Sequence, residues 1–154
     1  MKKTYCITDP CYILDDTTWD ACCKKCDNLG DVENWCENFN KVAEEALKDF
    51  TQGQAFVSDT GFGDWDNTLY GLTVSELGAF CADAGEVCVC ELTDEVAERL
   101  DDAFEHGRAA SFEAEGPIKV NFDTTDPSWT VVYIEDADGT CWNTSTVGDE
   151  DEEE

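Results

Sequence analysis

The sequence predicts a single α+β domain, in which an antiparallel or mixed β-sheet packs with two or three amphipathic helices. Two segments repeat apolar residues with the 3.6-residue period of a helix, and short apolar stretches bounded by Gly, Asp and Pro lie between and after them. The 154 residues are 42% hydrophobic and include eight Phe, five Trp and four Tyr, which suffices for one core. We expect this domain over residues 1–148 and a disordered tail over 149–154, where six acidic residues follow one another.

The N-terminal part predicts a strand, a turn and a short helix. Residues 4–7 are strand-like, Asp9-Pro10 is a turn, and the acidic and hydroxyl residues 15–18 are typical of a helix start. Gly30 is the expected stop of this helix. One helical face is formed by Trp19, Cys22, Cys23 and Cys26.

Residues 32–50 predict the clearest helix. Its apolar face is formed by Val32, Trp35, Phe39, Val42, Ala43, Ala46 and Phe50. Glu33, Glu37 and Glu44 cluster within about 40° on the far side, at roughly 100° per residue. Residues 54–59 and 68–74 then predict strands, and residues 79–83 and 86–92 predict a hairpin around Ala84-Gly85.

Residues 93–105 predict a second amphipathic helix, which opens at Thr93 and stops at His106-Gly107. Its inward face consists of Val96, Leu100, Ala103 and Phe104. Its outer face carries Asp94, Glu98, Asp101 and Glu105 within about 60° of one another. Three extended segments follow: 110–122, broken near Gly116-Pro117, then 129–135 and 141–147, which Asp138-Gly139 joins as a hairpin.

Charge is the most unusual property of the chain. Thirty-seven acidic residues face nine basic ones and one His, so the formal net charge is -28. A compact domain of this length is about 40 Å across, and duplex DNA carries about 24 charges over that distance. Such a density argues against direct binding of nucleic acid or an anionic membrane. It favours a basic protein, a cationic peptide or metal ions as the partner.

Cysteine and histidine limit the possible chemistry. Lacking a signal peptide or a membrane span, the chain is expected in the cytoplasm, with its ten cysteines reduced. Cys23-x-x-Cys26 allows a redox or zinc interpretation, but its place late in a helix favours a core role. The single His106 sits at a helix end, where a cation suits the helix dipole. We expect no cofactor and no catalytic triad.

Two sets of acidic residues remain as site candidates. Asp9, Asp59, Asp64 and Asp83 lie in turns or at strand ends; they either satisfy local backbone donors or form a divalent-metal or small-ligand site. The helix rows Glu33/Glu37/Glu44 and Asp94/Glu98/Asp101/Glu105 are either a solvated face or an anionic surface that binds a partner. Adaptation to high salt would explain the charge but not the cysteines.

Three segments resemble a group of small phage and mobile-element proteins. They are Ile7 to Leu14, with the pattern I-x-D-P-C-Y-x-L, Asp59 to Asp64, and Ala82 to Gly85. The likeness covers about residues 1–90 and departs from the group at Trp65, where glycine is usual. It implies a phage or mobile-element origin and supplies no activity.

Together these observations predict a non-enzymatic inhibitor of a host defence system, which acts in the host cytoplasm. It would present the acidic rows to the basic groove of a CRISPR effector or a restriction enzyme, as an acidic nucleic-acid mimic. Two alternatives stay open. One is a metal-dependent enzyme or small-ligand binder that uses the four Asp residues. The other is an acidic assembly or chaperone-like protein for a basic virion or nucleoid protein.

Overall fold

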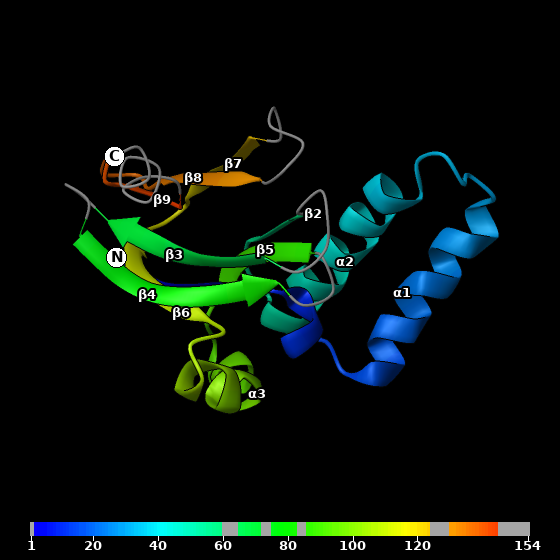
Figure 1. Ribbon diagram of the computed structural model, residues 1–154, viewed down its shortest axis with the longest axis horizontal. Helices are drawn as coiled ribbons and strands as arrows, with labels where there is room; N and C mark the ends of the chain where they lie inside the picture. Colours follow the sequence, from blue (N-terminus) through cyan, green and yellow to red (C-terminus); the bar gives the residue numbers. More distant parts are fainter. Residues whose placement is uncertain (1, 60–64, 72–74, 83–85, 124–129, 145–154) are drawn as a thin grey trace, which may run out of the picture.

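The computed structural model describes residues 2–59, 65–71, 75–82, 86–123 and 130–144. Helices, a four-stranded sheet and a five-stranded sheet form its three layers (Figure 1). The α+β prediction is therefore confirmed. The expected acidic tail, residues 149–154, lies outside the described residues.

The four-stranded sheet is the middle layer. It consists of β1 (Lys2–Thr8), β2 (Ala55–Asp59), β5 (Glu86–Glu91) and β6 (Ala110–Glu115), in the antiparallel order β2-β5-β1-β6. Successive residues of a strand point to opposite faces. Tyr5 and Ile7 of β1 accordingly join the core toward the second sheet, whereas Cys6 joins the core toward the helices.

The five-stranded sheet packs on the Tyr5 side of the first. It consists of β3 (Trp65–Gly71), β4 (Ser75–Ala82), β7 (Lys119–Asp123), β8 (Val131–Glu135) and β9 (Cys141–Asn143), in the antiparallel order β4-β3-β9-β8-β7. Phe112 of the first sheet contacts Trp142 of the second, with ring centroids 4.9 Å apart. The predicted break at Gly116-Pro117 is confirmed, because the chain leaves the first sheet there and enters the second.

The hairpin predicted for residues 79–83 and 86–92 is wrong. Both segments are strands, but β4 pairs with β3, whereas β5 pairs with β1 and β2 in the other sheet. Adjacent strands joined by a short glycine-containing segment favour a hairpin locally. Here β5 is apolar on both faces, from Val87 to Cys90, so it is most stable between two layers of core.

The β8–β9 hairpin predicted at Asp138-Gly139 is confirmed, and Gly139 has a φ of 86°. Asp136, which is buried, organises this turn. Its carboxylate accepts backbone N–H groups from Asp138, Thr140 and Glu115, each at 2.9 Å. Burial alone would raise the pKa of Asp136, but these three donors outweigh it and hold the pKa below its usual value.

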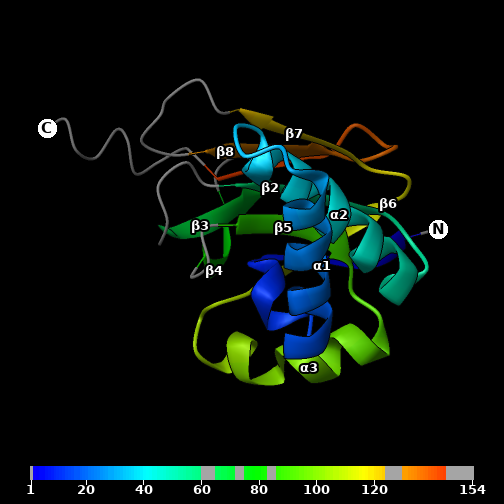
Figure 2. The same ribbon diagram turned by 90° about the vertical axis from the view of Figure 1, so that its right-hand side faces the viewer.

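Three helices and one 3-10 turn form the outer layer on the Cys6 side. They are η1 (Pro10–Tyr12), α1 (Asp16–Leu29), α2 (Trp35–Thr51) and α3 (Asp94–Glu105). Figure 2 shows α1 lying over α2, with α3 at one end of the pair. The predicted ends of α1 are confirmed: Asp15 Oδ1 accepts the Thr18 N–H at 2.8 Å, and Gly30 follows the helix with a φ of 71°.

The helix predicted from Val32 begins three residues later, at Trp35. Val32 is 84% exposed and does not belong to the core. The chain must reverse between α1 and α2, and the Trp35 indole N–H donates to Asp27 Oδ1 at 2.9 Å across that reversal. Glu33 therefore lies in the α1–α2 connection and not on α2.

Candidate functional site

The helix α3 buries one side and leaves the other to solvent. The Thr93 hydroxyl accepts the Val96 N–H at 3.3 Å and caps the first turn, as the sequence predicts. Val96, Leu100 and Ala103 are buried in the core between the helices and the four-stranded sheet. This packing fixes the direction in which the outer residues of α3 point.

The solvent side of α3 is covered by carboxylates. Its six exposed acidic residues are Asp94, Glu95, Glu98, Asp101, Asp102 and Glu105. At roughly 100° and 1.5 Å per residue, they occupy about 120° of the circumference over about 16 Å. This is about one charge per 3 Å along the helix axis, close to the axial rise of ~3.4 Å per phosphate of one DNA strand. The sequence prediction named four of the six and missed Glu95 and Asp102, which lie at one edge of the row.

Arg99 is the one basic residue within α3, and its guanidinium contacts segments outside this helix. Its Nη1 donates to the Ile13 carbonyl oxygen at 2.7 Å, and its guanidinium carbon lies 4.5 Å from the centre of the Phe50 ring. Its Nη2 also lies 3.8 Å from Asp15 Oδ2. The guanidinium thus joins α3 to the Ile13 backbone and to α2. Within α3, Glu95 and Asp102 are the acidic residues nearest to Arg99, whereas Asp94, Glu98, Asp101 and Glu105 lie about 100° or more from it around the helix.

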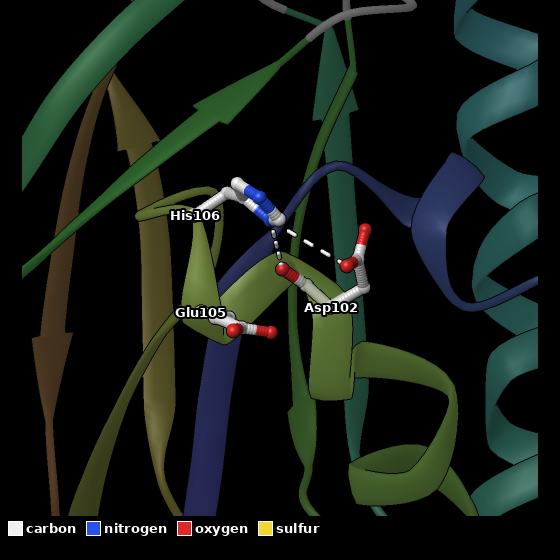
Figure 3. A group of neighbouring side chains, drawn as sticks. All are labelled: Asp102, Glu105 and His106. Atoms are coloured by element: carbon white, nitrogen blue, oxygen red, sulfur yellow. Dashed lines mark hydrogen bonds and ion pairs between the residues drawn. The ribbon is translucent and has the colours of Figure 1, made fainter.

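His106 follows the last turn of α3 (Figure 3). Its Nδ1 lies 2.9 Å from the Asp102 carbonyl oxygen and 3.5 Å from Asp102 Oδ1. With the proton on Nδ1, the ring donates to the Asp102 carbonyl, which also accepts the His106 backbone N–H at 3.1 Å. Among the described residues, Asp102, Glu105 and His106 could together hold a metal ion, since their ligand atoms lie within 4.8 Å of one another. All three are exposed, and such groups commonly hold no ion.

The acidic row predicted around α2 differs from that of α3. Glu37 is exposed and Glu44 half-buried on α2, while Glu33 lies outside the helix. Lys41 and Lys48 stand on the same side, within about 60° of Glu37 and Glu44. The sequence already contained this signal, because each lysine is four residues from a glutamate. The α2 row is therefore charge-alternating and not an anionic array.

Asp9 is the member of the second predicted set whose side chain the structure describes, and it is fully buried. Its Oδ1 accepts the Cys11 N–H at 2.8 Å and its Oδ2 accepts the Glu86 N–H at 3.4 Å. This carboxylate thus caps η1 and ties it to the start of β5. Asp59 ends β2 opposite Glu86 in the strand register. Asp64 and Asp83 lie outside the described residues, so the four-residue metal or ligand site stays a prediction.

The Cys23-x-x-Cys26 pair lies late in α1 and faces the core. Cys26 is buried and Cys23 half-buried in the cluster that joins the helices to the four-stranded sheet. Burial raises the pKa of both thiols. A redox CxxC needs a lowered pKa at a helix start, so these thiols pack as small core residues.

Fold and surface together define the class: an acidic α+β protein with two stacked sheets and an exposed carboxylate face on one helix. No protein-family model, curated protein or solved structure matches the chain. Within the described ranges, no helix combines the length and the apolar character that crossing a membrane requires.

Proposed function

We propose that this protein is a non-enzymatic inhibitor of a host defence nucleoprotein and comes from a phage or mobile element. It acts as an acidic nucleic-acid mimic that occludes the basic DNA- or RNA-binding groove of a CRISPR effector or a restriction enzyme. The observation that carries this proposal is the outer face of α3, where six exposed carboxylates stand together while the Arg99 guanidinium is held by the Ile13 carbonyl and the Phe50 ring. The origin rests on the resemblance of residues 7–14.

Repulsion between the carboxylates of this face lowers the stability of α3. Asp94/Glu98, Glu98/Asp102 and Asp101/Glu105 are like-charged pairs four residues apart. Each such pair costs roughly 0.2–0.5 kcal/mol, or about 1 kcal/mol in total. Lysine in place of Glu98 would remove two of these three pairs, and Lys41 holds the equivalent position between Glu37 and Glu45 on α2. Selection for binding a cationic surface explains why α3 keeps the carboxylates.

Carboxylates at phosphate-like spacing can take the place of phosphates against Lys and Arg side chains in a groove. The field of a protein with net charge -28 also speeds its encounter with a basic partner. We assign the main contacts to Asp94, Glu98, Asp101 and Glu105, with Glu95 and Asp102 beside them. Glu33, Glu37 and Glu44 would add weaker contacts, because Lys41 and Lys48 offset the charge of α2.

Competition with DNA tests the proposal. A candidate CRISPR effector or restriction enzyme is mixed with fluorescent target duplex, and displacement of the duplex by this protein is followed by anisotropy. We expect competitive displacement whose apparent inhibition constant rises steeply between about 50 and about 500 mM NaCl, as an interface built on charge requires. Inhibition that is insensitive to salt would contradict the mimic.

Two variants of equal net charge locate the contact. The first neutralises the α3 face with Asp94→Asn, Glu98→Gln, Asp101→Asn and Glu105→Gln. Its matched control neutralises four exposed acids of α1 and α2 with Asp16→Asn, Asp20→Asn, Glu45→Gln and Asp49→Asn. We expect the α3 variant to inhibit about 10-fold more weakly and the control to change less than about 3-fold. Equal losses would mean that net charge acts without a defined face.

An acidic assembly or chaperone-like protein would use the same surface on a different partner. In that case, the protein would keep a basic virion or nucleoid protein soluble and would leave defence nucleases active. Nuclease inhibition therefore separates the two functions, since only the inhibitor lowers cleavage of the target duplex.

A further inference from the structure

A group of buried cysteines lines the core between the helices and the four-stranded sheet. It includes Cys6 of β1, Cys88 and Cys90 of β5, and Cys22 and Cys26 of α1. None of the nine cysteines whose side chains are described forms a disulfide. The proposed inhibition uses none of these thiols, so their arrangement raises a separate question.

Cys6 and Cys90 are placed as disulfide partners. They stand directly opposite each other in the β1–β5 register, and their Sγ atoms lie 3.8 Å apart. Opposite residues of antiparallel strands have Cα atoms about 4.5–5.5 Å apart, within the range of about 4.4–6.8 Å that a disulfide allows. A small rotation of the two side chains is enough to bring the sulfurs to bonding distance.

Cys88 is the competing partner, and its geometry is poorer. It lies two residues from Cys90 on the same face of β5 and hydrogen-bonds to it. Two residues along one strand span about 6.6–6.8 Å, at the limit of what a disulfide tolerates. Cys90 therefore has one well-placed partner, which is Cys6.

The thiols differ in reactivity. The pKa of Cys6 is raised by its hydrogen bond with Cys90 and by burial. The pKa of Cys88 is raised by burial. Its hydrogen bonds with Cys6 and Cys88 lower the pKa of Cys90. Cys90 lies next to both other thiols, and we assign it the role of the attacking thiol. Because all three are fully buried, an oxidant reaches them only when the helical layer opens locally.

We propose that Cys6 and Cys90 form a thiol–disulfide exchange site whose co-reactant is a small uncharged disulfide. The Cys90 thiolate attacks one sulfur of that disulfide, forms a mixed disulfide and releases one small thiol. The Cys6 thiol then loses its proton to solvent and attacks the Cys90 sulfur, which releases the second small thiol. Two protein thiols are oxidised to one disulfide, and the small disulfide is reduced to two thiols.

This bond would join the two inner strands of the four-stranded sheet, at positions 84 residues apart in the chain. A cross-link that closes so long a loop restricts the unfolded chain strongly. The strongly negative protein disfavours an anionic disulfide such as oxidised glutathione, so an uncharged one is the suitable reagent.

Peptide mapping of the full chain tests the site. The native protein is incubated with 2-hydroxyethyl disulfide, the remaining thiols are blocked in denaturant, and the digest is analysed by mass spectrometry. We expect a cross-linked peptide pair containing Cys6 and Cys90, and a melting temperature at least about 5 °C higher than that of the reduced protein. A bond from Cys90 to Cys88, or native protein that keeps both thiols, would overturn the proposal.

Variants provide the second measurement. Cys6→Ala should abolish the cross-link and the rise in melting temperature, while Cys22→Ala should keep both. Cys22 is the matched control, because it is another buried thiol of the same core. If the Cys6→Ala protein still gained the same thermal shift, a different thiol pair would be responsible. The wild-type peptide map decides the question even where a variant fails to fold.

Discussion

The helix α3 and the α1–α2 pair cover the same side of the four-stranded sheet, yet they distribute charge in opposite ways. On α2, Lys41 stands four residues from both Glu37 and Glu45. On α3, Glu98 stands four residues from both Asp94 and Asp102. Lys41 and Glu98 therefore have the same spacing to their acidic neighbours but opposite charge. The acidic residues are attracted to the central residue on α2 and repelled by it on α3.

The basic residues of the two regions also differ in what they contact. Lys41 and Lys48 are exposed on the surface of α2, whereas the Arg99 guanidinium binds the Ile13 carbonyl and the Phe50 ring. On α2 the cations therefore balance neighbouring carboxylates, while on α3 the cation holds the helix in place. An acidic composition becomes a concentrated face only where the cations are directed elsewhere.

Removing the Arg99 side chain should have the largest effect on this comparison. Arg99→Ala loses a charged hydrogen bond and a ring contact, and we expect it to lower the free energy of unfolding by about 2 kcal/mol. Lys41→Ala, the matched change on α2, should alter it by less than about 0.5 kcal/mol. Urea unfolding measures both. Equal effects would mean that Arg99 acts as an ordinary surface charge.

Reversing the charge at Glu98 of α3 and at Lys41 of α2 should change the free energy of unfolding in opposite directions. Glu98→Lys converts two repulsive pairs on α3 into attractive ones and should raise the free energy of unfolding by about 1 kcal/mol. Lys41→Glu should lower it by about the same amount, because it makes α2 resemble α3. Thermal unfolding in low and in about 1 M NaCl provides the check, since salt should shrink both differences. Differences that persist in salt would point to packing instead of charge.

The N-terminal caps of α1 and α3, Asp15 and Thr93, should differ in how their contribution to stability depends on pH. We expect this effect to be the smallest of the three. The Thr18 backbone and side-chain donors, aided by Arg99, lower the pKa of Asp15. The Asp15 carboxylate therefore stabilises the fold above its ordinary pKa, and this contribution is lost as the pH falls through the lowered value. The destabilisation by Asp15→Ala should thus shrink between pH 7 and pH 3.

Thr93→Ala is the control for that prediction, because the hydroxyl cap of α3 does not titrate. It should cost about 1 kcal/mol at either pH, as followed by urea unfolding in buffers at both values. A Thr93→Ala effect that disappears in acid together with that of Asp15→Ala would show that global acid unfolding, and not the cap, sets the pH dependence.

Local signals in the sequence were sufficient for the two ends of α1, the start of α3 and one turn, but not for the start of α2. The capping residues Asp15 and Thr93, the stop at Gly30 and the Asp138-Gly139 hairpin all lie where they were predicted. Each acts over a few residues, because a cap or a turn satisfies backbone groups within one turn of the chain. The acidic side of α3 followed from helical periodicity alone, once the buried face was recognised.

The tertiary structure decided the features that depend on distant partners. The sequence could not show that β4 and β5 belong to different sheets, that Val32 is exposed, or that Arg99 binds the Ile13 carbonyl. Nor could it place Cys6 against Cys90, 84 positions away. Composition and periodicity determined which side of each helix is polar. Which charges remain unbalanced on that side, and which thiols meet in the core, depends on packing between segments far apart in the chain.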